Sequence, residues 1–183
     1  MKFLPTSLTS AAWFAAGVAL MPIIDYAWHA WIGHAKRPLP TRDQHREHHR
    51  APYLAAPTEE LRKNVPLAAA SAFGAALALT PLLGAKRAVP FAAGVVTAYV
   101  LITYSHARMH ARGPRTRYER WFWRFHFHHH FGDAKKNFGL ITPIFDVVFR
   151  TIEVPAVVTF PAQLAPQWLT ADQPGFRLRP SAA

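Results

Sequence analysis

The eleven histidines of this 183-residue chain gather in four short clusters. Neutral imidazole is a common ligand of iron, zinc and copper, so clusters of this kind are typical of metal sites. Their spacings are H-x4-H, H-x2-H-H, H-x3-H and again H-x2-H-H. The clusters are His29 and His34; His45, His48 and His49; His106 and His110; and His126, His129 and His130, with His128 interposed in the last. Histidines placed without design would be scattered, so this grouping indicates metal binding.

Helical spacing determines which rings of the last cluster can meet. Residues three and four apart lie on one face of an α-helix. The cluster can therefore point three rings the same way, at His126, His129 and His130. His128 lies off that face, and the remaining donors must come from the other clusters.

The first cluster needs an irregular helix. His29 and His34 lie about 140° apart on a regular helix, so an unbroken helix cannot direct both at one ion. Either the helix ends near Gly33 and His34 folds back, or a π-bulge realigns the two side chains.

The number of imidazoles indicates two metal ions. Ten donors are too many for one ion and suit two neighbouring ions with about five donors each. The chain has no cysteine, which excludes thiolate zinc sites and iron–sulfur clusters. Two nitrogen-bound metals side by side suggest a di-iron centre that activates O2, because iron can change its charge and zinc cannot. Zinc can nevertheless occupy the same imidazole sites.

The segments that position the clusters read as membrane helices. Residues 3–24, 65–85 and 88–105 carry no charge, and each stretch approaches the roughly 20 residues that cross a bilayer. We predict transmembrane helices at about 8–33, 65–85 and 88–110. Residues 140–158 are apolar but interrupted by proline and charges, which suggests an interfacial helix or a fourth half-span.

These helices predict an all-α integral membrane fold. The chain, 1–183, is expected to form a single domain whose histidine-rich helical cap, residues 35–64 and 111–151, holds a dimetal site. Within the cap, residues 118–131 read as an amphipathic helix whose Trp and Phe side chains suit the membrane interface. The proline-rich tail, 160–183, is expected to be irregular.

The distribution of basic residues predicts the topology. One span followed by a hairpin puts all four histidine clusters on one side of the membrane. That side has seven Lys or Arg before the hairpin and eleven after it, against Lys2, Lys86 and Arg87 on the other. The positive-inside rule makes the histidine side cytoplasmic, in a multi-pass protein of the bacterial inner membrane. The net charge of +11 follows from this arrangement and does not indicate nucleic acid.

The order of the clusters, with a hairpin between the second and third, resembles the fatty acid hydroxylase / sterol desaturase superfamily. Asn137-Phe138-Gly139, followed by PIFDVVFRT at residues 143–151, is similar to its C-terminal signature. The resemblance covers about residues 29–151. Members often end this signature with Phe-Gly-Thr, whereas this chain has Phe149-Arg150-Thr151, so the local turn is open to question.

Members of this superfamily are integral-membrane di-iron enzymes that use O2 to hydroxylate or desaturate lipids. The resemblance implies two Fe ions, a membrane lipid as substrate and a separate electron-donor protein. It implies these ligands, with no further catalytic residue: His29, His34, His45, His48, His49, His106, His110, His126, His129 and His130.

The function expected first is hydroxylation of a fatty acyl chain. A carotenoid hydroxylase and a sterol-type desaturase are the alternatives among enzymes. A metal transport or storage membrane protein is the alternative from another class. Transport requires polar ligands near the bilayer midplane, whereas the histidines here lie at or beyond helix ends.

Four further polar residues are assigned to the surroundings of the ligands. Asp25 lies one turn before His29. It either accepts a hydrogen bond from the ring N–H of His29, which would fix the tautomer of that histidine, or is a helix-end acid in headgroup water. His128 lies inside the last motif but off its pattern, and it is interpreted either as a neighbour of the ligands or as facing the substrate. Asn137 and Asp146 lie in the C-terminal signature. The sequence does not set the oligomeric state.

Overall fold

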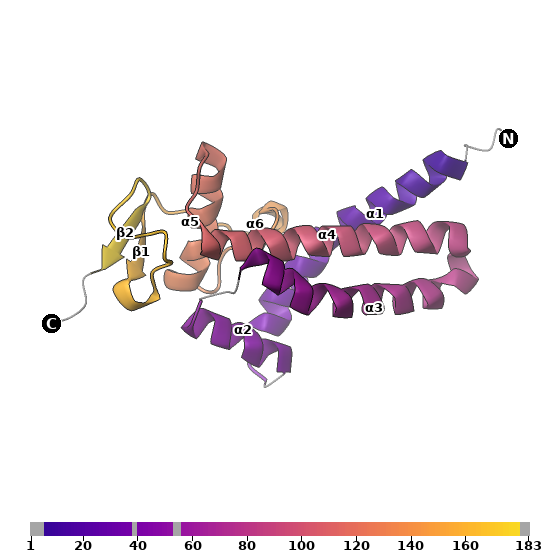
Figure 1. Ribbon diagram of the computed structural model, residues 1–183, viewed down its shortest axis with the longest axis horizontal. Helices are drawn as coiled ribbons and strands as arrows, with labels where there is room; N and C mark the ends of the chain where they lie inside the picture. The colour runs from indigo at the N-terminus through magenta and orange to yellow at the C-terminus, as the bar shows by residue number, and fades with distance from the viewer. Residues whose placement is uncertain (1–5, 38–39, 53–55, 180–183) are drawn as a thin grey trace. The chain divides into compact units, whose positions relative to one another are not determined.

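The computed structural model describes residues 6–37, 40–52 and 56–179 and is mostly helical (Figure 1). Its helices are α1 (Thr6–Ala27), the π-helix η1 (Trp28–Gly33), α2 (Pro40–Arg50), α3 (Pro57–Leu83), α4 (Ala85–Ala111), α5 (Arg117–Phe131) and α6 (Ile144–Val148). Strand β1 (Val158–Pro161), the 3-10 helix η2 (Ala162–Leu164) and strand β2 (Phe176–Arg179) follow. Predictions for Lys2 and for the last four residues of the tail lie outside the described residues.

The chain divides into two compact units. Unit 1 consists of Met1–Met21 and Thr58–Tyr104, and unit 2 of Pro22–Pro57 and Ser105–Ala183. All four histidine clusters belong to unit 2, so the geometry of the histidines is contained within one unit.

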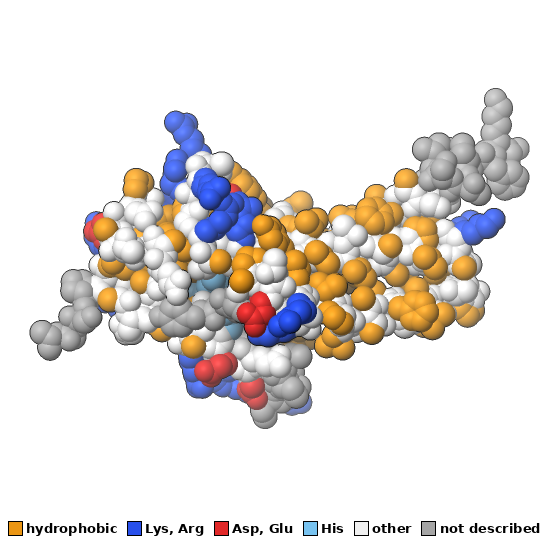
Figure 2. All heavy atoms as spheres, in the orientation of Figure 1, with side chains coloured by type: hydrophobic (Ala, Val, Ile, Leu, Met, Phe, Trp, Pro, Cys, Tyr) orange, Lys and Arg blue, Asp and Glu red, His pale blue; other side chains and the backbone are white. Residues whose placement is uncertain are grey.

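Three helical stretches are long and apolar enough to cross a membrane, as the sequence predicted: Thr9–Gly33, Pro57–Leu83 and Ala85–Ala111. The second begins at Pro57 rather than near residue 65, because a proline and the acidic Glu59 and Glu60 suit the first turn of a helix. The single residue Gly84, with a φ of 76°, lies between α3 and α4, where the chain turns back (Figure 1). Figure 2 shows hydrophobic side chains exposed along these helices, as lipid contact requires.

Within unit 1, α1 and α4 approach each other backbone to backbone at two glycines. A Cβ on Gly17 would overlap the carbonyl oxygen of Phe91, and a Cβ on Gly94 would overlap the carbonyl oxygen of Phe14. Close approach at small residues is how membrane helices gain packing contacts without a hydrophobic driving force. The two glycines therefore set the spacing of this helix pair.

Gly17→Ala is expected to lower stability by about 1–3 kcal/mol, because the added methyl must push α1 and α4 apart. Gly74→Ala is the matched control, since a Cβ there meets no atom within 4 Å and alanine is the better helix former. Thermal unfolding in detergent should show a lower Tm for the first variant and an unchanged or higher Tm for the second. Equal Tm values for the two variants would contradict the close contact.

The aromatic side chains of α5 form the core of unit 2. Phe122, Trp123, Phe125 and Phe127 are buried with Met109 of α4 and with residues of the C-terminal segment: Val158, Phe160, Leu169 and Phe176. The prediction that these α5 side chains lie at the membrane interface is therefore wrong for the four buried ones. The chain after residue 157 folds back over them and removes them from solvent and lipid.

That C-terminal segment is the main departure from an all-α fold. Strands β1 and β2 pair in parallel, from Val158 with Phe176 to Pro161 with Arg179. Val158, Phe160 and Phe176 point into the aromatic core. The tail predicted to be irregular from residue 160 thus holds a two-stranded sheet, because its apolar residues have the α5 face to pack against.

The predicted half-span is not present in residues 140–158. Their helix, α6, has five residues and at about 1.5 Å per residue is shorter than even half of the roughly 30 Å of a bilayer core. Ile144, Val147 and Val148 of α6 are all more than half exposed. This short apolar face agrees with the interfacial alternative.

Candidate metal centre

The π-helix η1 aligns the two histidines of the first cluster. The amide N–H of His34 donates to the carbonyl oxygen of His29 at 3.2 Å, a bond across five residues in place of the usual four. The two rings consequently stack, with centroids 5.4 Å apart. Of the two solutions left open by the sequence, the structure has the π-helix, and the chain leaves helical geometry directly afterwards at His34.

One group of five imidazoles is assembled from η1 with the residue that follows it, from α2 and from α5. We name it the first histidine group; one ring nitrogen from each member lies within 4.8 Å of those of the others. The Nε2 atoms of His29 and His129 are 3.0 Å apart, and those of His34 and His129 are also 3.0 Å apart. The members of the first histidine group are His29, His34, His45, His49 and His129.

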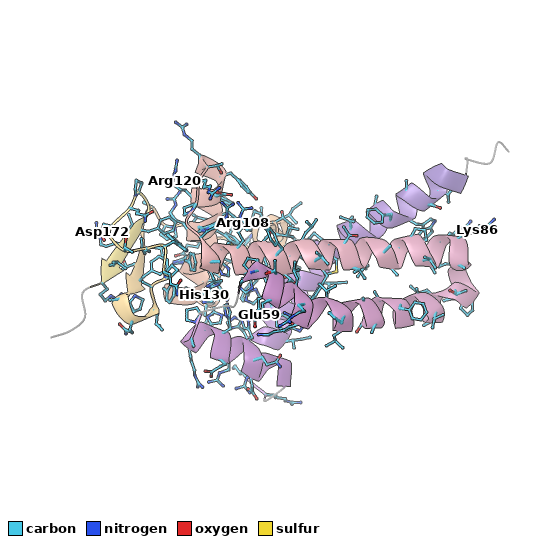
Figure 3. The ribbon with its side chains drawn as sticks, viewed as in Figure 1. Glu59, Lys86, Arg108, Arg120, His130 and Asp172 are labelled. Atoms are coloured by element: carbon cyan, nitrogen blue, oxygen red, sulfur yellow. The ribbon has the colours of Figure 1, made fainter. Side chains whose placement is uncertain are left out.

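A second group of five comes from α2, α4 and α5. The same limit of 4.8 Å holds for its ring nitrogens. The Nε2 atoms of His110 and His126 are 2.9 Å apart, and those of His48 and His106 are 3.2 Å apart. Figure 3 labels His130 of α5, which belongs to this group. The members of the second histidine group are His48, His106, His110, His126 and His130.

The two groups adjoin and share their helices. The rings of His49 and His130, one from each group, stack with centroids 4.3 Å apart. The structure thus brings together all ten histidines that the sequence assigned, five to a group. It corrects one expectation: the rings of the last cluster do not act as one set, because His129 joins the first group while His126 and His130 join the second.

Hydrogen bonds to backbone carbonyls fix the tautomers of two ligand candidates. Nδ1 of His29 lies 2.5 Å from the Phe138 carbonyl oxygen, and Nδ1 of His129 lies 2.6 Å from that of Lys136. A carbonyl oxygen can only accept, so each Nδ1 carries the proton and each Nε2 of a neutral ring presents a lone pair. Two lone pairs therefore face each other across 3.0 Å, an arrangement that a shared cation satisfies.

The second group contains several ring nitrogens with no protein partner. Both ring nitrogens of His130 and the Nδ1 atoms of His48 and His126 are buried with no hydrogen-bond partner in the described protein. Buried polar atoms are normally paired, so this donor set fits a metal ion.

Burial keeps the rings outside the helical spans neutral. It lowers the pKa of His45 to about 3, with repulsion from His49 and His34 adding to the effect. Burial likewise lowers the pKa of His49 to about 4, again with a contribution from His34. The pKa of His126, His129 and His130 falls well below the ordinary value for the same first cause. Near neutral pH these imidazoles therefore offer lone pairs to a metal.

A buried turn supplies the carbonyl that orients His29. The carboxylate of Asp146 accepts hydrogen bonds from the amides of Phe138 and Gly139, at 2.8 and 2.9 Å, and from the Thr151 hydroxyl at 2.7 Å. Burial raises the pKa of this carboxyl, and the three donors oppose the shift. Asp146 thus holds the turn whose Phe138 carbonyl accepts from His29.

Asn137 fixes the same turn against α5. It is fully buried, and its side-chain amide donates to the carbonyls of Phe125 and Glu153 while its side-chain oxygen accepts from the amide of Glu153. Its φ of 60° is in the left-handed region, which asparagine tolerates better than most residues. Asn137 and Asp146 therefore support the first histidine group through backbone contacts.

The other two predicted supporting residues lie elsewhere. Asp25 does not hold the His29 ring: its carboxylate accepts from the Leu140 amide at 2.8 Å, and the Nδ1–H of His29 donates to the Phe138 carbonyl instead. His128 belongs to neither group, and its Nε2 lies 3.1 Å from a Glu153 carboxylate oxygen. Sequence reasoning did not identify the carbonyls of Lys136 and Phe138, because every residue has a backbone carbonyl and no residue type marks this role.

The turn that departs from the family signature places Arg150 in the left-handed region. Arg150 has a φ of 59°, a conformation that costs a side chain-bearing residue about 1–2 kcal/mol. The amide of Thr151 still donates to the Asp146 carbonyl at 2.8 Å. The turn therefore holds Arg150 in a strained conformation.

Arg150→Gly is expected to be neutral or to stabilise the fold by up to about 1 kcal/mol, because relief of the left-handed strain outweighs the extra freedom of the unfolded chain. Arg150→Val is expected to destabilise, since a β-branched residue is least tolerated there. Thermal unfolding of the two variants beside the parent chain measures both effects. A glycine variant less stable than the valine variant would show that the turn does not need this conformation.

The fold and the sequence can be compared with those of known proteins. A solved structure titled "Full length scs7p (only hydroxylase domain visible)" shares the fold, with a TM-score of 0.57 and 19% identity over 80% of this chain. This chain spans 57% of the length of that one. No curated protein sequence matches this chain significantly.

The sequence itself matches a family model. That of fatty acid hydroxylase covers residues 14–151, which include the ten grouped histidines and the turn held by Asp146. This confirms the resemblance that the cluster order indicated: the chain belongs to the fatty acid hydroxylase family, within the fatty acid hydroxylase / sterol desaturase superfamily.

Proposed function

We propose that the chain is an integral-membrane, O2-dependent di-iron enzyme that hydroxylates a C–H bond of a lipid, with a fatty acyl chain as substrate. The observation that carries the proposal is the pair of adjoining groups of five neutral imidazoles, in a chain of this family. The proposal treats residues 1–183 as one membrane hydroxylase domain, with the histidine cap on the cytoplasmic side.

The donor sets favour iron over zinc. Structural zinc sites are almost always four-coordinate, and catalytic ones combine three protein ligands with water. Five imidazoles per group exceed both arrangements. Iron can also change its oxidation state, and the bound pair would supply the reductive activation of O2 that an unreactive C–H bond requires.

The protein's own residues orient the ligands and exclude water. The Phe138 and Lys136 carbonyls hold the His29 and His129 rings with Nε2 directed inward. The Phe138 ring lies edge-on to both of these imidazoles, at 5.6 and 5.5 Å between centroids. Phe127, also buried, contacts His110 and His126 of the second group. These contacts keep the nitrogens dry and preorganised.

Electrons and substrate come from outside the chain in this proposal. Hydroxylation consumes one O2, two electrons and two protons per C–H bond and releases one water. The proposal includes a separate electron-donor protein, as the resemblance to the superfamily implies. The exposed apolar helices, which are long enough to cross a membrane, support a substrate taken from the lipid bilayer.

The test joins metal analysis to lipid analysis. The chain is expressed in bacteria, purified in detergent and analysed for iron, and whole-cell lipids are analysed by mass spectrometry beside those from cells expressing His48→Ala. The proposal expects about two irons per chain and acyl lipids that have gained one oxygen only with the parent chain.

Other outcomes identify the alternatives. Hydroxylated carotenoids with unchanged acyl lipids would indicate a carotenoid hydroxylase, and lipids that have lost two hydrogens would indicate a desaturase. Bound metal without any change in lipids, together with metal uptake that follows expression, would replace the proposal with metal transport or storage.

A further inference from the structure

Three of the six residues that line a second concave site in unit 2 are arginines. It is an open hollow of about 370 Å³, bounded by Arg117, Arg120, Arg124, Ala156, Pro174 and Gly175. The arginines follow a spacing of three and four residues and so share one face of α5. The volume is within the range of about 300–1,000 Å³ that holds small ligands. Figure 3 labels Arg120 on α5, and Figure 2 shows Lys and Arg side chains gathered over this helix.

The positive charge of this arginine hollow is not balanced by the described protein. Throughout residues 6–37, 40–52 and 56–179, the ion pairs with Asp and Glu involve other basic residues, such as Arg108, Lys136 and Arg177. The Arg124 guanidinium donates to the carbonyl oxygens of Pro155 and Ala156, at 3.1 and 2.9 Å, and both acceptors are neutral. Like charges at this helical spacing repel, so the site attracts an anion.

Another hollow in unit 2 shows the contrasting case. It has a volume of about 240 Å³ and is also lined in part by an arginine, Arg108. There, however, Glu119 pairs with both Arg108 and Arg112. In that hollow a carboxylate of the chain itself neutralises the arginine charge, whereas no described carboxylate pairs with the arginines of the arginine hollow.

We propose that the arginine hollow binds the phosphate group of an anionic ligand. Guanidinium groups bind phosphate oxygens in pairs, through charge-assisted hydrogen bonds that fix both distance and direction. The small residues Ala156 and Gly175 leave room for such a group. A Cβ on Gly175 would come within 2.8 Å of Arg124 Cδ, so glycine is needed to keep that guanidinium in place. The phosphate belongs either to the headgroup of an anionic phospholipid or to a soluble compound.

Binding at this hollow would connect α5 to the C-terminal segment. Three of its six lining residues come from α5, and three from residues 156–175. The same helix carries His126, His129 and His130, so a ligand that clamps its first turns also steadies the helix that serves both histidine groups. This role does not depend on the chemistry proposed for the metals.

The experiment measures thermal stability of the purified full chain in detergent while a phosphate-bearing probe is added. The probes are inorganic phosphate, a short-chain phosphatidylglycerol and, as a zwitterionic comparison, the matching phosphatidylcholine. Arg117→Gln combined with Arg120→Gln removes two charges from the hollow and leaves Arg124 on its carbonyls. Arg177→Gln combined with Arg179→Gln is the control, because it removes two exposed charges of β2 that do not line the hollow.

A bound ligand at a hundred times its Kd should raise Tm by about 5 °C or more. The first double variant should weaken the effect at least about tenfold in ligand concentration, and the control pair should respond like the parent chain. A response to phosphatidylglycerol but not to inorganic phosphate identifies a lipid headgroup, and a response to inorganic phosphate identifies a soluble ligand. The proposal is overturned if neither phosphatidylglycerol nor inorganic phosphate raises Tm, a result that would favour an acidic protein partner for these arginines. It is also overturned if the two lipids raise Tm equally, or if the two double variants lose the same part of the Tm increase.

Discussion

In the proposed di-iron enzyme, His129→Ala and His126→Ala are each expected to reduce bound iron from about two ions per chain to about one, and each to abolish lipid hydroxylation. The two residues lie three positions apart on α5 yet belong to different histidine groups. Each variant therefore empties a different group. The loss of activity should exceed the roughly 100-fold decrease that follows even from removing a partner of a metal ligand.

The control variant for these two lies on the same turn of α5. His128 belongs to neither group and contacts Glu153 instead, so His128→Ala should retain both irons and most of the activity. Iron content of the monodisperse protein, measured beside turnover of acyl lipid, separates the three variants. Full iron content and turnover in His126→Ala or His129→Ala, or loss of both irons in His128→Ala, would contradict the assignment of the two groups.

The spacing of the histidines made the composition of the site predictable, but not its division. Counting ten imidazoles gave two sets of five, which is what the structure contains. The membership could not be read from the sequence, because helices α2 and α5 each serve both groups: His45 and His49 of α2 belong to one, and His48 to the other. Which side of a helix meets which neighbour is decided by tertiary packing, and helical periodicity does not contain that information.

The fold shows the same limit. The three apolar spans were predictable because bilayer thickness sets their length. The aromatic face of α5 was assigned to the membrane interface since Trp and Phe suit that position equally well. The structure instead covers Phe125 and Phe127 with Phe160 and Phe176 of the C-terminal segment. The proline-rich tail gave little indication of strands. The sequence therefore offered no other partner than the membrane for the aromatic side chains of α5.

Irregular backbone was predictable only where a side-chain requirement demanded it. His29 and His34 needed a departure from the α-helix, and the π-helix η1 provides it. The carbonyls of Phe138 and Lys136 had no such marker, although they fix two tautomers. Asp25 was the more visible candidate for that contact, being one turn from His29, but its carboxylate is engaged by the Leu140 amide.

Asp146→Ala is expected to destabilise the protein by about 3–5 kcal/mol and to deplete the first histidine group of its metal. The substitution leaves the buried amides of Phe138 and Gly139 and the Thr151 hydroxyl without their acceptor. The Phe138 carbonyl then loses its fixed position, and with it the constraint on the His29 tautomer. Iron content and Tm measured on the same detergent-purified sample test both effects.

Two comparison variants separate loss of the turn from general loss of the fold. Asp172 also accepts a backbone amide, that of Leu178, but in an exposed position, so Asp172→Ala should cost no more than about 1 kcal/mol and keep both irons. Asp146→Asn retains one acceptor oxygen of similar shape and should recover part of the Tm while its iron content stays reduced. Full iron content in Asp146→Asn would show that the tautomer of His29 is set without this turn, because the remaining amide cannot accept from all three donors at once.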